Sequence, residues 1–304
     1  MKKVLCLLYH RVHPVEDEIF HLTVSPEHFE QQMEYLHKYY PIFRFEDEWA
    51  EPGEDGIVVT FDDGYGDNLD YALPILEKYH IPATIFVTTG YVNGNQEYWW
   101  DELARILTRD LAYPDRFELK DSLYRYTWET DSLEKRVDML RSLHWLLKLD
   151  DEVERANSWL EQLRRWAGVG LEGRKENLPA DLNGLHALAQ SEYITIGGHT
   201  VNHRSLGAQT KEHQQYEIGA SVRFLEKELG KKIEVFSYPF GSRMHFNEDT
   251  FDVCRQCGIK KAASTLKGIW IEGMHPYTVP RMEVKDDNGE EFGAFLQECW
   301  RYGR

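Results

Sequence analysis

A buried β-strand that ends in two acidic residues is predicted by residues 56–65, which read GIVVTFDDGY. The run up to Phe61 is mostly apolar or β-branched, as in strands that are covered on both faces of a sheet. A helical pattern follows at Asn68–Tyr79, and another apolar run begins at Ala83. Because strand, helix and strand in succession are the repeat of a parallel sheet, this stretch predicts an α/β fold with two carboxylates at a strand end.

The same alternation recurs on both sides of this stretch. Strands are predicted at Val4–Tyr9, Gly56–Phe61, Ala83–Thr88, Tyr193–Ile196, Glu234–Tyr238, Lys261–Ser264 and Tyr277–Val279. Helices are predicted between them at Pro26–Tyr39, Asn68–Tyr79, Lys211–Leu229 and Asn247–Cys257. Roughly seven strands, covered by helices on both faces of the sheet, favour a barrel or part of one.

One stretch breaks this alternation. Residues 99–179 contain almost no strand signal and many charged helix formers. Within them, apolar residues recur at helical spacing in Leu133–Leu149 and Glu152–Trp166. We therefore expect a helical insertion at residues 99–179, with residues 1–98 and 180–304 forming the α/β domain.

The composition excludes several classes of function. The 304 residues include 35 Lys and Arg against 52 Asp and Glu, which gives a formal net charge of −17. Nucleic-acid binding needs clustered basic residues, so no nucleic-acid partner is expected. No apolar run approaches the ~20 residues of a membrane helix, and the run Val4–Tyr9 is shorter than the core of an export signal. We therefore expect a cytoplasmic protein without stable membrane insertion.

Asp62 and Asp63 are the first candidate functional residues. Carboxylates at the end of a buried strand are costly unless a cation stabilises them, and adjacent side chains there point in different directions. One aspartate can therefore bind a metal ion while the other acts as a general base. The alternative is that the two side chains only cap a turn before the next helix.

The second candidate is the segment Gly197–His203, which reads GGHTVNH and follows another predicted strand. Histidines four positions apart lie on one face of a helical turn, a spacing that lets two imidazoles converge on one metal ion. The alternative is a pair of surface histidines in a glycine-rich loop.

The two candidates are expected to meet, because the carboxyl ends of parallel strands share one face of an α/β fold. One carboxylate and two imidazoles form a three-ligand set with one position open, which is the pattern of catalytic zinc. A third segment, Ser237–Gly241, also follows a predicted strand. Its Pro-Phe-Gly turn can direct a backbone N–H into the site as an oxyanion donor, although alone it is an ordinary turn.

These segments resemble the first three motifs of the polysaccharide deacetylases, also called carbohydrate esterase family 4 or the NodB homology domain. The matching motifs, in the family's order, are Thr60–Gly64, His199–His203 and Tyr238–Gly241. The resemblance covers about residues 1–98 and 183–283. It implies a distorted (β/α)7-type barrel that uses zinc or a similar divalent ion to remove acetyl groups from N-acetylated sugars.

The resemblance also implies roles for single residues. Asp63, His199 and His203 resemble the family's metal ligands, and Asp62 resembles its general base. The backbone N–H of Phe240 resembles an oxyanion contact. Zn²⁺ is the expected ion, and Co²⁺ and Ni²⁺ accept the same ligands.

The third motif departs from the family pattern. It usually begins with an arginine that orients the base, where this chain has Phe236 and Ser237. The chain instead offers Arg281, after the last predicted strand, in a Pro-Arg ending that recurs in one branch of the family. We therefore expect Arg281 to be the cationic partner of Asp62.

The general acid is also missing from its usual place, because no late strand ends in a Leu-x-His sequence. The segment Leu8–Val12, which reads LYHRV, is similar to the same branch of the family, in which a histidine at the end of the first strand takes the place of the acid, as in a permuted motif order. We expect His10 to be the general acid, with His275 as the second choice.

The sequence thus predicts a metal-dependent N-deacetylase of a polysaccharide or its precursor, with an N-acetylated glycan as its partner. One alternative is an amidohydrolase of a small N-acylated molecule, and another is a carbohydrate-binding relic that has lost catalysis. Five aromatic residues are candidates for stacking on sugar rings, namely Tyr65, Trp99, Trp100, Tyr238 and Trp270.

Overall fold

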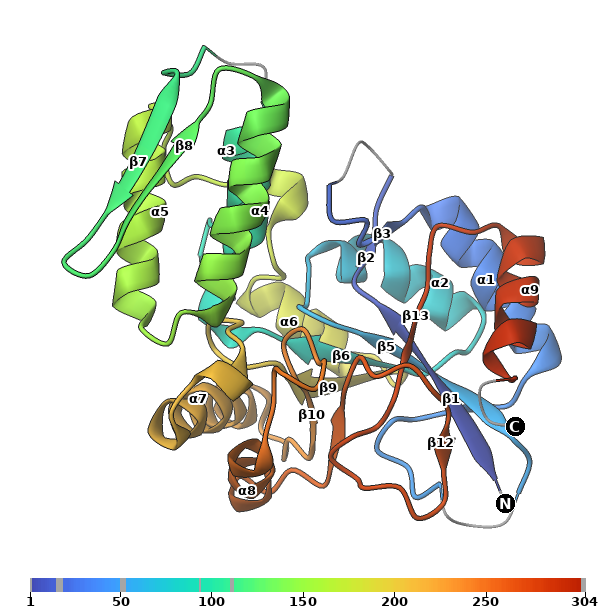
Figure 1. The fold of residues 1–304 in the computed structure, drawn as a ribbon. Helices are drawn as coiled ribbons and strands as arrows, with labels where there is room; N and C mark the ends of the chain where they lie inside the picture. Colours follow the sequence, from blue (N-terminus) through green and yellow to red (C-terminus); the bar gives the residue numbers. More distant parts are fainter. Residues whose placement is uncertain (1, 15–18, 50–52, 93, 110–111, 302–304) are drawn as a thin grey trace. The chain divides into compact units, whose positions relative to one another are not determined.

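The computed structural model describes residues 2–14, 19–49, 53–92, 94–109 and 112–301 (Figure 1). Residue contacts divide the chain into two compact units. The first comprises Met1–Asn93 and Pro179–Arg304, and the second comprises Gly94–Leu178. Within the described ranges, no helix has both the length and the apolar character that crossing a bilayer requires.

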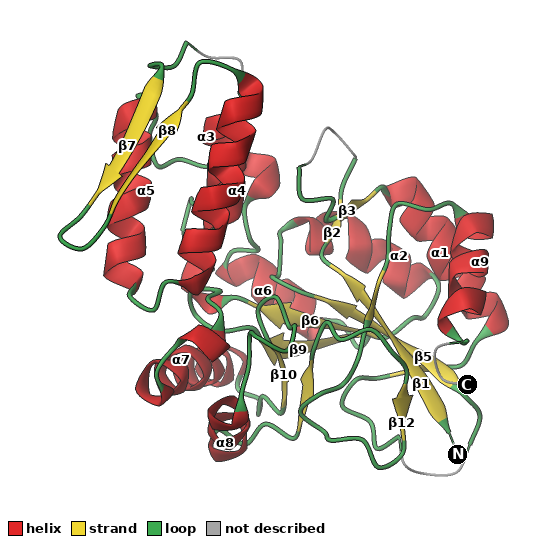
Figure 2. Ribbon diagram, viewed as in Figure 1, coloured by secondary structure: helices red, strands yellow, loops and turns green. Residues whose placement is uncertain are grey.

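A curled, mostly parallel sheet forms the centre of the first unit (Figure 2). In the described residues it has nine strands along the path β11-β10-β9-β6-β5-β1-β12, with β4 added to β5 and β13 to β1. The strands are β1 (Lys3–Tyr9), β4 (Ile42–Phe43), β5 (Gly56–Phe61), β6 (Ala83–Val87), β9 (Ile194–Gly198), β10 (Val235–Ser237), β11 (Lys261–Ala263), β12 (Trp270–Ile271) and β13 (Met282–Glu283). The predicted fold class, a distorted (β/α)7-type barrel, is confirmed as a half-barrel with surrounding helices.

Helices cover this sheet, as the alternating pattern predicts. They are α1 (Pro26–Tyr39), α2 (Leu73–Lys78), α6 (Leu182–Gln190), α7 (Lys211–Leu229), α8 (Glu248–Gln256) and α9 (Gly289–Cys299). The side chain of Ser25 caps α1 and that of Thr210 caps α7, each by accepting a hydrogen bond from a backbone N–H of the first turn. The helix expected at Asn68–Tyr79 differs at its start, because Asn68–Ala72 forms a π-helical turn before α2 begins.

The pairing of β1 with β5 fixes the position of two site segments. The register is parallel from Val4 opposite Gly56 to Tyr9 opposite Phe61. Both strands are buried almost throughout, which agrees with their continuous apolar sequences. The backbone N–H of Asp62 donates to the carbonyl of Tyr9 at 2.9 Å, so the residues that follow the two strands leave the sheet side by side.

The segment expected to be a strand at Tyr277–Val279 behaves differently from the prediction. Only Val279 bridges β11, opposite Ala263, and the chain then crosses to β13, where Met282 pairs with Leu7 of β1. The segment from Val279 to Glu283 therefore contacts β11, at one end of the sheet path, and β1, which is next to the other end. We call it the closing segment, and Arg281 lies in its middle.

The second unit contains three helices and also an antiparallel hairpin that the sequence did not predict. Its helices are α3 (Trp99–Leu107), α4 (Leu133–Leu149) and α5 (Val153–Ala167), and the hairpin strands are β7 (Arg116–Lys120) and β8 (Arg125–Glu129). The residues of β7 alternate between buried and exposed, which is the pattern of a strand with one covered face. The strand was not predicted because it is short and its exposed positions are charged, so its sequence lacks the apolar run on which the other strands were predicted.

Candidate active site

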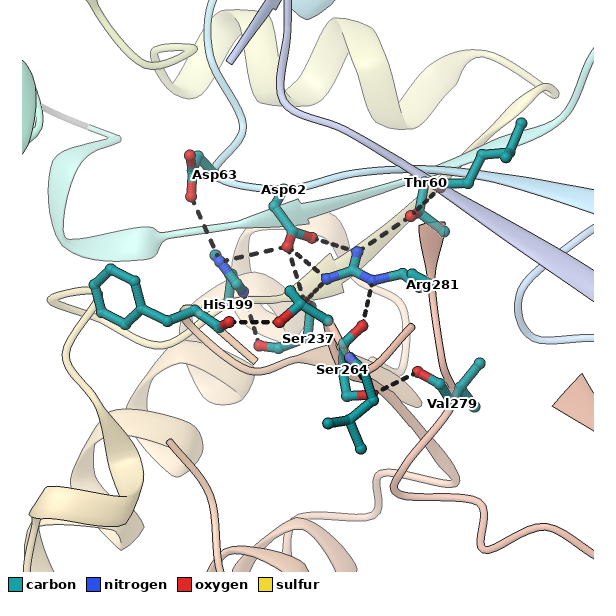
Figure 3. Close-up of polar contacts among 12 residues, drawn as sticks. Thr60, Asp62, Asp63, His199, Ser237, Ser264, Val279 and Arg281 are labelled. Atoms are coloured by element: carbon teal, nitrogen blue, oxygen red, sulfur yellow. Dashed lines mark hydrogen bonds and ion pairs between the residues drawn. The ribbon is translucent and has the colours of Figure 1, made fainter. Parts of the chain in front are cut away.

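Strand ends of the first unit bring the three motif segments together. Asp62 and Asp63 follow β5, His199 follows β9, and Ser237 ends β10 (Figure 3). Strand β6 pairs with both β5 and β9, and Gly198 of β9 pairs with Phe236 of β10. The expectation that residues 62–63 and 199–203 meet at one face of the sheet is therefore fulfilled in the structure.

Asp63, His199 and His203 form a compact set of possible metal ligands. One donor atom from each lies within 4.8 Å of the others, and all three side chains are buried. An Asp63 carboxylate oxygen lies 3.2 Å from Nε2 of His203 and 3.5 Å from Nε2 of His199. Two imidazole nitrogens and a carboxylate oxygen suit Zn²⁺ and related ions, so the residues present fit a divalent metal.

A backbone carbonyl fixes the orientation of His199. Nδ1 of this ring lies 2.7 Å from the carbonyl oxygen of Ser237. Because a carbonyl can only accept, Nδ1 carries the hydrogen, and the lone pair of the neutral ring is on Nε2, which faces Asp63. This second contact holds the ring in the tautomer that a metal ligand needs.

The segment from His199 to His203 is not the helical turn that the spacing predicts. Thr200 and His203 have positive φ angles of 67° and 53°, which break a right-handed helix, and the two rings nevertheless lie 5.0 Å apart. The loop is held instead by Glu217 of α7, a buried residue. One carboxylate oxygen of Glu217 accepts from the backbone N–H groups of Val201 and Asn202, both at 2.9 Å.

Backbone strain is concentrated at this site. Among the described residues, six other than glycine have positive φ, and four of them are Asp63, Thr200, His203 and Phe240. Such conformations cost free energy and persist where the surrounding structure imposes them, which is common at functional sites. The positive φ at Asp63 and His203 also shows why the spacing along the chain is a poor guide to how these side chains point.

Arg281 is the partner of Asp62, as predicted from the sequence. Its guanidinium contacts both carboxylate oxygens of Asp62, at 2.8 and 2.6 Å, and it is 1% exposed (Figure 3). It also donates to the hydroxyl groups of Thr60 at 3.1 Å and Ser237 at 2.8 Å, and to the carbonyl of Ser264 at 3.0 Å. These bonds fix the arginine in the two-pronged arrangement that recognises a carboxylate.

Ser237 occupies the place where the third motif was expected to have an arginine. Its hydroxyl donates to Asp62 at 3.2 Å while accepting from Arg281. Ser237 and Glu217 are the two residues near the site whose contacts the sequence analysis missed. The departure from the motif marked position 237, whereas nothing in the spacing of α7 marked Glu217.

The charges of the site act on one another. Burial alone would raise the pKa of Asp62, but Arg281 and His199 outweigh it and hold the pKa below its ordinary value. Burial likewise opposes ionisation of Asp63, and the two histidines still lower its pKa. Burial lowers the pKa of His203, while the two carboxylates raise that of His199. The carboxylates therefore favour a positive charge in their midst.

The two candidate acids lie in different places. His10 directly follows β1 and is partly exposed, and its imidazole is close enough to contribute to the lowered pKa of Asp62 and Asp63. His275 is exposed, with its ring 4.9 Å from that of Phe251 and 5.5 Å from that of Tyr277. The pairing of β1 with β5 places the residue after Tyr9, which is His10, beside Asp62, and the choice of His10 as the acid stays a prediction.

Phe240 lies beside the possible metal ligands, and its ring is 4.8 Å from that of His203. Its φ of 62° is set by a tight turn, in which the N–H of Gly241 donates to the carbonyl of Pro239 at 2.8 Å. The backbone of residue 240 is thus held in an unusual conformation next to the site, and the oxyanion role of its N–H stays a prediction.

The five aromatic residues named as candidates for stacking on sugar lie in the interior of the protein. All five are buried, with Tyr65 and Tyr238 at 0% exposure and the others at 1–8%, namely Trp99, Trp100 and Trp270. Trp99 and Trp100 pack against each other within the second unit, with ring centroids 5.3 Å apart. These large side chains fill the cores of their units, as aromatic residues commonly do.

A family model described as polysaccharide deacetylase matches residues 50–112 and 175–262. The unmatched stretch between these ranges lies within the second unit. The matched ranges include both aspartates, both histidines and Phe240, whereas His10 and Arg281 lie outside them.

Named relatives cover nearly the whole chain. The Bacillus subtilis protein YxkH, which is named as a polysaccharide deacetylase, is 22% identical over 97% of this chain and 76% of its own. A poly-β-1,6-N-acetyl-D-glucosamine N-deacetylase of Staphylococcus aureus is 22% identical over 93% of this chain and 79% of its own.

Solved structures of deacetylases share the fold. The Streptococcus pyogenes deacetylase PplD, in complex with acetate, aligns with a TM-score of 0.61 at 18% identity, covering 97% of both chains. IcaB from Ammonifex degensii aligns with a TM-score of 0.60 at 18% identity, covering 98% of both chains. Together with the family model and the named relatives, these matches place the chain in the polysaccharide deacetylase family, to which it belongs.

Proposed function

We propose that this protein is a metal-dependent hydrolase that removes the N-acetyl group from an N-acetylated sugar in a polysaccharide or its precursor. The proposal rests on two buried groups of side chains that lie next to each other where β5 ends. Asp63 and two imidazoles form a donor set for a divalent ion, and the neighbouring Asp62 is held by Arg281. Metal and base are the two parts that amide hydrolysis by water needs.

The ion would be held by Asp63, His199 and His203. We propose Zn²⁺, because its preferred ligands include histidine and aspartate. Such an ion lowers the pKa of water and polarises a carbonyl group. The contacts of Ser237 and Glu217 already described fix the tautomer of His199 and the loop that carries His203.

Asp62 would take the proton from the attacking water. Arg281 keeps this carboxylate ionised and, together with the hydroxyl of Ser237, aims it. The backbone N–H of Phe240 would donate to the oxygen that becomes negative when the carbonyl carbon is attacked. His10 would then protonate the leaving amine, since an amine anion is a very poor leaving group.

Two observations weigh against the alternative of a non-catalytic relic. Its motivation was the missing arginine of the third motif, and Arg281 fills that role from another part of the chain. Its second motivation was the missing late histidine, and His10 follows Tyr9, whose carbonyl accepts from the backbone N–H of Asp62. An N-acetylated glycan is favoured over a small N-acylated molecule by the named relative that acts on poly-β-1,6-N-acetyl-D-glucosamine. The cytoplasmic location stays a prediction from the sequence.

The proposal is tested by acetate release from N-acetylglucosamine oligomers. We expect release by the purified protein, loss of release after chelation, and recovery when Zn²⁺ or Co²⁺ is restored. Asp62→Asn should lower turnover by on the order of 10²–10⁴ while the protein keeps its metal, because only the base is removed. Substantial turnover by this variant would contradict the assignment of Asp62. Hydrolysis of small N-acylated amides without any glycan hydrolysis would instead favour the small-molecule amidohydrolase.

A further inference from the structure

A buried ion pair lies beside the strand end that carries His10. Nε of Arg11 is 2.8 Å from a carboxylate oxygen of Asp67, and the two residues are 4% and 5% exposed. The guanidinium also lies over the ring of Tyr65, 4.6 Å from its centroid. None of the roles proposed above uses Arg11 or Asp67.

The simplest explanation for Asp67 is that it caps the π-helical turn Asn68–Ala72, which it directly precedes. Its side chain, however, makes no capping hydrogen bond to that turn. Its oxygens accept instead from Arg11, from the backbone N–H of Val12 at 3.3 Å and from the side-chain amide of Asn68 at 3.1 Å. Asp67 therefore binds the segment after β1, and within the turn that follows it binds only the side chain of Asn68 and no backbone N–H.

Asn68 completes the attachment of this segment. Its side-chain amide donates to the carbonyl of His10 at 3.0 Å, and the residue is fully buried. Residues 10, 11 and 12 are thus each bound by Asp67 or Asn68, which lie five and six positions after Asp62. The π-helical turn begins at Asn68, and single π-turns of this kind are frequent at functional sites.

The other side of the segment is held by a short parallel ladder. Strand β2 (Arg11–Val12) pairs with β3 (Thr23–Val24), and the N–H groups of Arg11 and His13 donate to the carbonyls of Leu22 and Val24. His10 lies between this ladder and the end of β1. Its backbone is therefore fixed relative to the loop that contains Asp62 and Asp63.

A buried ion pair is a poor means of stabilising a fold. Removing two charges from water costs several kcal/mol, and apolar residues of similar volume often serve stability equally well. Burial raises the pKa of Asp67 even with the opposing effect of Arg11, which shows that the desolvation cost is only partly offset. What the pair provides beyond stability is directional bonding to a particular stretch of backbone.

We propose that Arg11, Asp67 and Asn68 are positioning residues that hold His10 where it can protonate the leaving amine. This inference rests on the proposed function and on the role given there to His10. The metal ligands and Asp62 do not fix the position of His10. That position depends instead on side chains of the loop that follows Asp62 and Asp63.

The test compares two substrates that differ in their need for an acid. Release of an amine from N-acetylglucosamine oligomers requires protonation of the leaving group, whereas 4-nitrophenyl acetate releases a stable phenolate. Arg11→Met/Asp67→Leu removes both buried charges together, so neither is left unpaired, and Asn68→Ala removes the bond to His10. We expect amide hydrolysis to fall about 10- to 100-fold in each variant, as part of the 10²–10⁴-fold that an acid provides, with ester hydrolysis unchanged within about twofold.

A second measurement repeats these changes in a His10→Ala background. If the three residues act through His10, they should cause no further loss of amide hydrolysis there. The control is Glu102→Leu/Arg164→Met, which removes a partly buried ion pair from the second unit, where Arg164 lies 2.9 Å from Glu102. It should leave the ratio of amide to ester hydrolysis unchanged.

The outcomes separate this inference from the proposed function. Equal losses on both substrates, or a further loss in the His10→Ala background, would mean a merely structural role and would overturn the inference. If His10→Ala itself left the substrate ratio unchanged, the role of His10 would be wrong and this inference with it. Absence of acetate release by the unmodified protein with Zn²⁺ would refute the proposed function. Circular dichroism and metal content confirm that each variant is folded.

Discussion

The two units each bury a cluster of charged groups, and the clusters differ in what faces the carboxylates. In the second unit, Glu97 contacts Arg105 and Arg174, and Glu102 contacts Arg105 and Arg164. Every partner there is a guanidinium, which stays charged at any physiological pH. In the first unit, Asp62 also has a guanidinium, but its neighbour Asp63 faces two imidazoles.

This difference separates charges that hold a fold from charges that are available for chemistry. A carboxylate that faces only guanidinium groups has partners that stay protonated and have no lone pair to offer, so it cannot form a metal site with them. A carboxylate between imidazoles has neighbours that donate lone pairs once they are neutral, and the three together can bind a cation. Burial and charge alone therefore do not identify an active site; the identity of the partner does.

The largest effect that would test this comparison is expected for Asp63→Asn. The amide keeps the size of the side chain but removes the negative charge that the donor set needs. We expect purified protein to contain little Zn²⁺ and turnover to fall on the order of 10³-fold, because a metal contributes several kcal/mol to amide hydrolysis. Metal analysis and acetate release measure the two effects. Full metal content in this variant would remove Asp63 from the ligand set.

A smaller effect on turnover is expected for Arg281→Met, which leaves Asp62 buried without its guanidinium. Turnover should fall about 10²-fold, and the free energy of unfolding should fall by about 3–5 kcal/mol, the usual cost of breaking a buried pair. Arg281→Lys should restore part of both. The measurements are kcat for acetate release and denaturant unfolding.

The matched control for this prediction lies in the other cluster. Arg164→Met leaves Glu102, whose pKa burial already raises, without one of its partners. We expect it to lower stability while leaving kcat unchanged at temperatures where the protein is folded. If both arginine variants lost stability and activity in parallel, the distinction between the two clusters would fail.

The smallest effect is expected for Glu217→Gln, since this residue acts only through the loop that carries His203. In the native protein the two carboxylate oxygens of Glu217 accept three hydrogen bonds from residues 201 and 202. The amide of glutamine has a donor in place of one of these oxygens, so it cannot accept all three. Zn²⁺ affinity should fall about tenfold, the lower end for residues behind metal ligands. Competition with a chelator measures it, and Glu212→Gln, exposed on the same helix, is the control. An unchanged affinity would show that the loop holds its shape without Glu217.

Much of the site could be predicted because its residues lie at strand ends. The continuous apolar runs before Asp62 and His199 identify β5 and β9, and parallel strands bring their carboxyl ends to one face. Arg281 was predicted from a departure in the motif, and its contact with Asp62 agrees with that expectation. What failed was local backbone geometry, as in the segment from His199 to His203.

The failures have a common physical cause. A positive φ at Thr200, a β-branched residue, is imposed by tertiary contacts such as that of Glu217 with the next two N–H groups, and no local preference announces it. The hairpin β7–β8 was missed because its strands are short and half covered. The aromatic residues could only be named as candidates for sugar stacking, because nothing in the sequence alone distinguishes Trp100 in a core from a tryptophan on a binding face.

Asp62, the proposed base, depends on the closing segment for its guanidinium partner, whereas none of the possible metal ligands lies in that segment. A polypeptide ending before residue 281 would already contain Asp63, His199 and His203, together with the strands β5 and β9 that present them. It would lack the guanidinium that neutralises Asp62, and with it the link from β11 across to β1. The possible metal ligands and the partner of Asp62 therefore come from separate stretches of the chain, so a change confined to the closing segment would disturb the carboxylate of Asp62 without removing any of the three ligands.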